Sequence, residues 1–368
     1  KTMSTNERFK VDNLKTRFVS VLLRIFVALS NEPPSLTDVA PYGTCNTGPD
    51  ALAWLSSSND SNVERMCTQH DNLERCWYSY SPPSLMSKGA GIQVPLVVHL
   101  HGSGGCASLP SLGWGTIADD DGFLVVWPQG TLHTQFGQEL TSWNDGSGLF
   151  GAEAAGIDDL GFLEQMVDTL LEQNNNIDPL RVYMSGHSNG AVMAQRFALQ
   201  TSGKLAGVVS VSGSAKPNDP EWSPGGASIT IYQPTPIILI HGTIDNVVPF
   251  DTRKGPLAGA VASYKGWAAL NQCSDSDDIE TANGYNIYTS TGCDHNNTNS
   301  GRVALVEVFD SGHHPISRGI EPFLISSANV IAECPFRGPI FYYEPDCKLI
   351  DLDSTRLAWE FIRQFQSF

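Results

Sequence analysis

Short apolar runs separated by amphipathic segments dominate the pattern of this 368-residue chain. The runs are nearly continuous rather than alternating, which is typical of strands that are covered on both faces in a parallel sheet. They stand at residues 94–100, 123–127, 181–185, 205–212, 236–241 and 303–309. A further segment, 75–80, alternates between polar and apolar positions and predicts another strand.

Helical periodicity fills the stretches between these runs. Apolar residues recur at steps of three and four over residues 160–171, with Asp158 or Asp159 available as the N-cap. Similar segments stand at residues 191–199, 261–270 and 355–365. The alternation of strands and helices predicts an α/β fold with a mostly parallel, doubly wound sheet and flanking helices. We predict one catalytic domain over residues 37–368.

The first 36 residues form a separate N-terminal segment. Basic residues precede an apolar run at 18–29 that ends near the small residues Ala28 and Ser30. This pattern favours a secretory signal or anchor, although Arg24 interrupts it, and an amphipathic first helix is the alternative. A run of roughly 12 residues is too short to span a bilayer, so no stable membrane span is expected.

Charge and cysteine usage narrow the class of protein further. The net charge is −17, which disfavours nucleic-acid binding and peripheral membrane binding. The eight cysteines form no C-x-x-C pair, and an even, scattered set suits disulfides in an oxidising compartment. Two N-glycosylation sequons, at Asn59 and Asn296, agree with an extracellular location.

A G-x-S-x-G pentapeptide follows the 181–185 run and precedes a helical segment. The serine is Ser188, and glycines stand two positions before and after it. A sharp strand-to-helix turn lifts a serine Oγ clear of the backbone, and small flanking residues let that turn close. The pattern therefore predicts a nucleophile, although a five-residue motif also occurs by chance.

A base and an orienting acid stand downstream in hydrolase order. Asp245 follows the 236–241 run in the sequence H-G-x-x-D-x-x-V-P, and His313 follows the 303–309 run. We predict that His313 takes the proton of Ser188 and that Asp245 orients the imidazole. The nearest rivals for these two roles are His314, Asp251 and Asp310.

The oxyanion hole requires two backbone donors near Ser188. We predict the N–H of Asn189, which follows the nucleophile, and the N–H of Ser103 in the glycine-rich stretch after residue 100. A phosphate-binding loop is disfavoured because no Lys-Ser/Thr follows the glycines. His99 and His101 are interpreted as structural, since no third metal ligand is evident, and no metal site is predicted.

Together these motifs resemble the polyhydroxybutyrate depolymerase and feruloyl esterase group, close to carbohydrate esterase family 1. The resemblance covers roughly residues 85–315 and the last helix. Its motifs are Leu100-His101-Gly102, Trp127-Pro128-Gln129-Gly130, Ser142-Trp143-Asn144, Asp158-Asp159-Leu160-Gly161-Phe162, Gly186-His187-Ser188-Asn189-Gly190 and Gly312-His313.

The resemblance implies the α/β-hydrolase fold and an extracellular serine esterase without metal or organic cofactor. It also implies a Cys273–Cys293 disulfide. The chain departs from the group after His313, where Trp-Pro is often found, and residues 326–351 look like an insertion in which Cys334 and Cys347 close a loop. The pairing of the other four cysteines stays open. Candidate pocket residues are Trp114, Trp143, Phe150 and His187.

The leading hypothesis is a secreted carboxylic-ester hydrolase that works through an acyl-enzyme. The resemblance implies feruloyl or acetyl esters of plant polysaccharide, or short-chain hydroxyalkanoate polyesters, as substrates, so the partner is an ester that can be polymeric. A serine peptidase on the same fold is the first alternative. A non-catalytic binding protein on a hydrolase fold ranks lower, because all three triad residues are present in order.

Overall fold

The structure is a computed structural model that describes eleven segments of the chain. They are residues 62–86, 91–107, 113–135, 137–201, 203–215, 217, 232–251, 258–274, 276–293, 301–313 and 352–367. The expectations for segment 1–36, the insertion 326–351 with Cys334 and Cys347, both sequons and His314 lie outside these residues.

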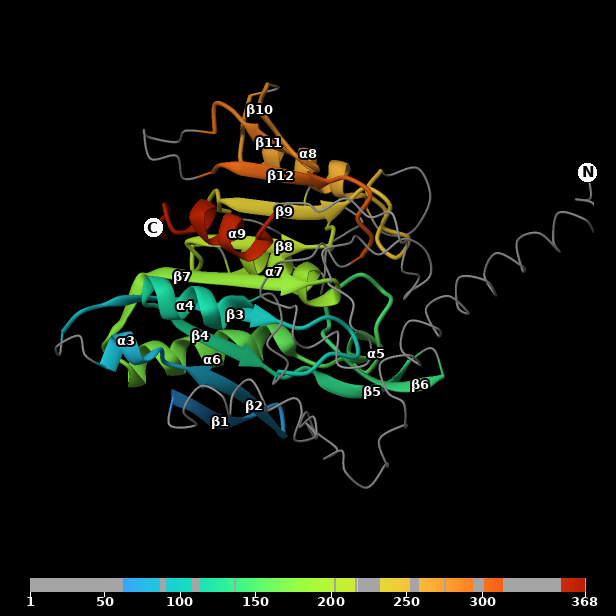
Figure 1. The fold of residues 1–368 in the computed structure, drawn as a ribbon. Helices are drawn as coiled ribbons and strands as arrows, with labels where there is room; N and C mark the ends of the chain where they lie inside the picture. The colour runs from blue at the N-terminus through green and yellow to red at the C-terminus, as the bar shows by residue number, and fades with distance from the viewer. Residues whose placement is uncertain are drawn as a thin grey trace, which may run out of the picture.

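One twisted sheet runs through the described part of the chain (Figure 1). Its ten strands stand in the order β1 (Val63–His70), β2 (Leu73–Tyr80), β4 (Leu124–Pro128), β3 (Val94–Leu100), β7 (Ile177–His187), β8 (Gly207–Val211), β9 (Ile237–Gly242), β12 (Val303–Val308), β11 (Tyr285–Ser290) and β10 (Asp277–Ala282). Neighbours from β4 to β12 are parallel, whereas the outer pairs at both edges are antiparallel.

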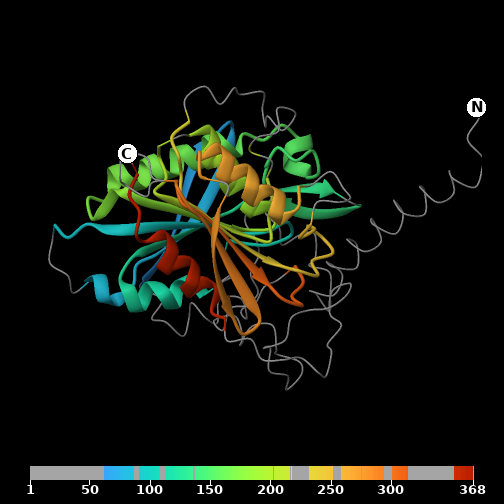
Figure 2. The ribbon, with the colours of Figure 1, turned by 90° about the horizontal axis from the view of Figure 1, so that it is seen from above.

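Helices cover both faces of this sheet (Figure 2). One face carries α6 (Asp159–Gln173), α7 (Asn189–Gln200) and α8 (Ala260–Leu270), and the other carries α4 (Trp114–Asp121) and α9 (Ser354–Ile362). The short helices α3 (Pro83–Met86) and α5 (Gly151–Ala154) and a separate hairpin, β5 (Thr131–Gln135) with β6 (Gln138–Ser142), complete the described elements. The predicted fold class, a mostly parallel doubly wound sheet, is confirmed.

The continuous apolar runs are explained by burial on both faces. Every residue of β3, β4, β8 and β9 is buried. One apolar cluster lies under α6, α7 and α8, and a second lies under α4 and α9. Helix α6 begins as predicted, with the Asp158 carboxylate accepting a hydrogen bond from the Gly161 N–H at 3.0 Å.

Two hairpins were not predicted from the sequence, namely β10–β11 at one edge of the main sheet and β5–β6 outside it. Strand β10 exposes nearly all its residues, including Asp277 and Asp278, and therefore lacks the apolar alternation that marks a half-buried strand. The β5–β6 hairpin lies outside the main sheet, so it also carries no long apolar run.

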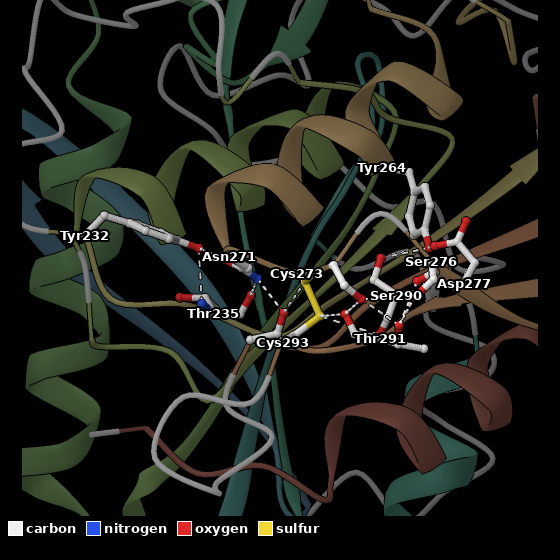
Figure 3. The surroundings of a disulfide bond; sticks show 12 residues. Tyr232, Thr235, Tyr264, Asn271, Cys273, Ser276, Asp277, Ser290, Thr291 and Cys293 are labelled. Carbon is white, nitrogen blue, oxygen red and sulfur yellow. Dashed lines mark hydrogen bonds between the residues drawn. A yellow bond between two sulfur atoms is a disulfide. The ribbon is translucent and has the colours of Figure 1, made fainter.

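Two disulfides join neighbouring segments. Cys67 and Cys76 face each other across β1 and β2, and Cys106 is also disulfide-bonded. The predicted Cys273–Cys293 bond is confirmed and links the segment after α8 to the segment after β11 (Figure 3). Over the residues that the structure describes, no helix has both the length and the apolar composition to cross a bilayer.

Candidate active site

Ser188 stands at the turn between β7 and α7. Its backbone angles are φ 54° and ψ −121°, a conformation that residues with a side chain rarely adopt. A Cβ on Gly186 would lie less than 3.0 Å from the Gly190 backbone, and one on Gly190 would lie less than 3.0 Å from the backbone oxygens of Leu100 and His101. Both glycines of the pentapeptide are therefore required by close packing rather than by positive φ.

The structure brings the three predicted triad residues into one hydrogen-bonded chain. Asp245 lies in the segment after β9, and His313 lies in the segment after β12. The Nε2 of His313 is 2.9 Å from Ser188 Oγ, and its Nδ1 is 2.8 Å from Asp245 Oδ2. Because parallel strands end at the same sheet edge, three segments far apart in sequence deliver these side chains to one place.

Asp245 is held as a carboxylate. Its Oδ1 accepts hydrogen bonds from the N–H groups of Val247 and Val248 at 2.8 and 2.9 Å. Burial by itself raises the pKa of this carboxyl, but the His313 ring and the hydrogen bonds from His241 and His313 hold it well below its usual range. Asp245 is therefore ionised at neutral pH and can stabilise an imidazolium at His313.

The two predicted oxyanion donors border the nucleophile. Asn189 is the first residue of α7, where N–H groups have no acceptor within the helix. Ser103 follows Gly102, on which a Cβ would lie 3.3 Å from the Cβ of Ser188. The Ser103 Oγ accepts a hydrogen bond from Gln135 Nε2 at 2.5 Å, so the β5–β6 hairpin positions this loop. The predicted roles of both donors stay predictions.

His101 fixes the glycine-rich loop by hydrogen bonds. Its Nδ1 donates to the Gly102 carbonyl at 2.8 Å, and its Nε2 accepts from the Gly130 N–H at 3.0 Å. Burial lowers the pKa of His101 to about 4, so the ring is neutral. Gln129 completes the support by accepting a hydrogen bond from the Ala107 N–H at 2.8 Å. The Trp-Pro-Gln-Gly motif thus supports the glycine-rich loop that contains Ser103.

His99 has no part in this support. It is buried on β3 and pairs with Ser185 Oγ at 3.1 Å, and burial lowers its pKa to about 3.

One cluster among the described residues has the spacing of metal ligands, and it consists of Cys67, Glu74 and Cys76. A metal site is disfavoured there because its two cysteines are joined in a disulfide.

The Asn189 side chain clamps a loop that sequence reasoning did not assign a role. Its Oδ1 accepts from the Trp143 N–H at 2.7 Å, and its Nδ2 donates to Asp145 Oδ2 at 2.6 Å. Asp145 is fully buried and also accepts from the Ser147 N–H at 2.9 Å. Burial raises the pKa of Asp145 to about 6, although these two hydrogen bonds oppose the shift.

A buried ion pair anchors the same loop from the other side. Arg75 on β2 donates to Asp159 Oδ1 at 2.6 Å, and both side chains are buried. The second oxygen of Asp159 accepts from the Asn144 N–H at 2.7 Å, while Arg196 on α7 donates to the Asn144 carbonyl at 2.6 Å. Asn144 of the Ser-Trp-Asn motif and Asp159 of the Asp-Asp motif meet in this network. These two motifs were the signal in the sequence that could have indicated it.

Two of the candidate pocket residues are corrected. Trp114 is 1% exposed and donates from its indole N–H to Ser185 Oγ, while Trp143 is 0% exposed and donates to the His101 carbonyl. Both tryptophans lie in the core, because their large apolar rings are stabilised there, and neither offers surface to a substrate. Phe150 is half-buried at the start of α5.

His187 lies beside the triad. Its Nε2 is 3.0 Å from the His313 carbonyl oxygen, and the two rings are 5.1 Å apart. Asp251 and Asp310, the rival acids, are exposed, and neither replaces Asp245 against His313.

Comparison with known proteins identifies a family for this chain. A family model described as Phospholipase/Carboxylesterase matches residues 88–272, half of the chain. The chain is similar to the bifunctional acetylxylan esterase/xylanase XynS20E of Neocallimastix patriciarum, with 30% identity over 48% of this chain and 22% of that protein. It is also similar to acyl-protein thioesterase 1 of Yarrowia lipolytica, with 31% identity over 34% of this chain and 56% of that protein.

A polyester depolymerase is among the similar proteins as well. Poly(3-hydroxyalkanoate) depolymerase C of Paucimonas lemoignei is 29% identical over 34% of this chain and 29% of its own length. Among solved structures, an acetyl xylan esterase from Aspergillus awamori has a TM-score of 0.48 and 16% identity, covering 70% of this chain and 96% of that chain. The matched segment spans less than two thirds of the length of each of these three relatives.

Proposed function

Because the chain belongs to the phospholipase/carboxylesterase family of hydrolases, we propose that it is a serine carboxylic-ester hydrolase with Ser188 as its nucleophile. The observation that supports this most directly is the hydrogen-bonded chain from Ser188 Oγ through His313 to Asp245. This is the geometry in which a base removes the serine proton as the oxygen attacks an acyl carbon.

The proposed reaction has two halves. His313 Nε2 takes the Ser188 proton while Ser188 Oγ forms a bond to the ester carbon, and the N–H groups of Ser103 and Asn189 bind the oxyanion. The same proton then passes from His313 to the leaving alcohol, which leaves an acyl-enzyme. In the second half, His313 takes a proton from water while the water oxygen bonds to the acyl carbon. His313 then returns this proton to Ser188 Oγ as the bond between Oγ and the acyl carbon breaks and the carboxylic acid leaves.

The proposed substrates are feruloyl or acetyl esters of plant polysaccharide, or short-chain hydroxyalkanoate polyesters, and the proposed location is extracellular. The activities of two similar proteins, an acetylxylan esterase/xylanase and a poly(3-hydroxyalkanoate) depolymerase, support this range. The disulfides Cys67–Cys76 and Cys273–Cys293, together with the disulfide-bonded Cys106, support an oxidising compartment.

A panel of esters tests the proposal. We expect the wild-type protein to hydrolyse p-nitrophenyl acetate and to be labelled at Ser188 by a fluorophosphonate probe. Ser188→Ala should lose labelling and reduce kcat by at least roughly 10³-fold, with an unchanged melting temperature. Ester turnover retained by Ser188→Ala would contradict the assignment, and faster cleavage of peptides than of feruloyl, acetyl-xylan and hydroxybutyrate esters would favour a peptidase instead.

A further inference from the structure

A second histidine contacts the acid of the triad. His241 lies on β9, its side chain is 1% exposed, and its Nε2 is 3.2 Å from Asp245 Oδ2. The same Nε2 is 2.8 Å from the carbonyl oxygen of Val248. His241 thus contacts both the Asp245 carboxylate and the backbone of Val248, three residues after Asp245. It therefore bridges the turn that carries Asp245.

The position of the proton on His241 follows from its neighbours. Nε2 faces two oxygen acceptors, so it carries the hydrogen. Nδ1 is buried and has no hydrogen-bond partner among the described residues. A buried N–H without an acceptor costs more than a bare ring nitrogen, so the neutral tautomer with hydrogen on Nε2 fits this site.

We propose that His241 is a positioning residue that orients Asp245 and shares its carboxylate with His313. Asp245 Oδ2 then pairs with His313 Nδ1 at 2.8 Å and lies 3.2 Å from His241 Nε2, whose single N–H is shared between Oδ2 and the Val248 carbonyl oxygen. The other oxygen, Oδ1, accepts from two backbone N–H groups. Contacts on both oxygens therefore favour one orientation of the carboxylate. This proposal rests on the proposed function, since the positioning serves catalysis only if the triad is used.

Among the residues that the structure describes, the charged group nearest to His241 on its strand neighbours is Glu307. Glu307 stands opposite it in the register of β12, but the Glu307 carboxylate accepts hydrogen bonds from Tyr288 at 2.8 Å and Asn286 at 3.1 Å. On the remaining side the ring packs against Phe250, with centroids 6.2 Å apart. In the described part of the chain, the ionisable groups on the carboxylate side are thus Asp245 itself and, through it, His313.

Sharing the carboxylate has a consequence for the rate profile. A second donor on Oδ2 reduces the negative charge that Asp245 presents to His313. In a variant without that donor, Asp245 presents its full negative charge to His313 and stabilises the protonated ring. Less of the free base is then available at a given pH. The acid limb of the kcat/KM profile should therefore move to higher pH when the donor is removed.

Three variants test this inference. His241→Phe removes the donor, and we expect the acid limb to rise by roughly half a pH unit or more and kcat to fall about tenfold. His241→Gln returns an N–H near the position of Nε2 and should restore both values in large part. His99→Phe is the matched control, because His99 is an equally buried strand histidine without contact to the triad.

The control separates positioning from stability. His99→Phe should lower the melting temperature while leaving the acid limb in place. An acid limb in His241→Phe that stays within about 0.1 pH unit of the wild type, or moves to lower pH, overturns the inference.

A proton NMR measurement does not depend on turnover. The hydrogen bond between His313 Nδ1 and Asp245 should give a strongly deshielded signal, identified by its loss in His313→Gln. We expect this signal in the wild type and in His241→Gln, and broadening or loss in His241→Phe. If the wild type hydrolyses no ester but the signals behave in this way, the proposed function fails and the positioning role stands; an unchanged signal in His241→Phe overturns the positioning role.

Discussion

Close packing around Ser188 sets the first residue-scale constraint. The turn requires α7 to approach the end of β3, and Gly190 is the point of contact with the backbone oxygens of Leu100 and His101. Gly190→Ala should therefore destabilise the protein by more than the roughly 1–3 kcal/mol typical of overpacking, because backbone rather than a flexible side chain must move. Thermal unfolding and fluorophosphonate labelling measure the two consequences.

A second glycine supplies the comparison for this prediction. A Cβ on Gly207 of β8 meets only side-chain carbons at 3.4 and 3.5 Å, which is ordinary contact. Gly207→Ala should change the free energy of unfolding by less than about 1 kcal/mol and leave labelling intact. Equal effects of the two substitutions would show that the Gly190 contact does not constrain the turn at Ser188.

Asp145 makes stability depend on pH. Its folded pKa, about 6, lies above the usual 3.8 of an unfolded aspartate, so the folded state binds the proton more tightly. The carboxyl therefore costs stability above pH 6, and this cost is relieved as the pH falls through 6. Between pH 7.5 and pH 5, the difference in unfolding free energy between wild type and Asp145→Asn should shift by about 1 kcal/mol in favour of the wild type. Denaturant titrations at the two pH values measure it, and a constant difference would contradict the buried-carboxyl account.

At the level of elements, the β5–β6 hairpin contacts the glycine-rich loop that carries Ser103, the predicted oxyanion donor. Gln135 donates to Ser103 and accepts from the Gly151 N–H at 2.7 Å. Gln135→Leu keeps a side chain of similar volume but removes both hydrogen bonds of Gln135. We therefore expect kcat to fall about tenfold or more with a smaller change in KM. Thr134→Ala, at an exposed position of the same strand, should leave both constants unchanged. A rise in KM alone would assign Gln135 to substrate binding instead.

The sequence predicted the central strands and helices because each carries enough apolar residues to show its period. It also pointed to Ser188, Asp245 and His313, since chemically distinctive residues there follow strand ends in order. The supporting residues were missed for a physical reason. Contacts such as Arg75 with Asp159 join positions 84 residues apart, and no local pattern reports which buried charges meet.

Exposure explains the other misses. Strand β10 is polar because it lies at a sheet edge in contact with solvent, and its pairing with β11 is a backbone property. The tryptophans failed as pocket residues because aromatic composition does not say which side of the sheet buries the ring. Trp114 lies in the apolar cluster under α4, and the backbone N–H of Trp143 donates to the Asn189 side chain.

At the scale of the whole molecule, the sheet joins segments that come from all parts of the described chain. The edge formed by β10, β11 and β12 carries the Cys273–Cys293 bond, which joins positions 20 residues apart beside exposed hydroxyl groups (Figure 3). In the chain-entropy account, closing such a loop stabilises the folded state by about 3 kcal/mol. The double variant Cys273→Ser with Cys293→Ser should therefore lower Tm by on the order of 4 °C.

The contribution of the covalent bond can be separated from that of its surroundings. Ser276→Ala removes an exposed hydroxyl next to the same disulfide and should leave Tm nearly unchanged. Under reducing conditions the wild type should approach or fall below the double variant, because reduction opens the Cys67–Cys76 bond as well. A Tm that is insensitive to both reduction and the double substitution would mean that strand pairing alone stabilises this antiparallel edge.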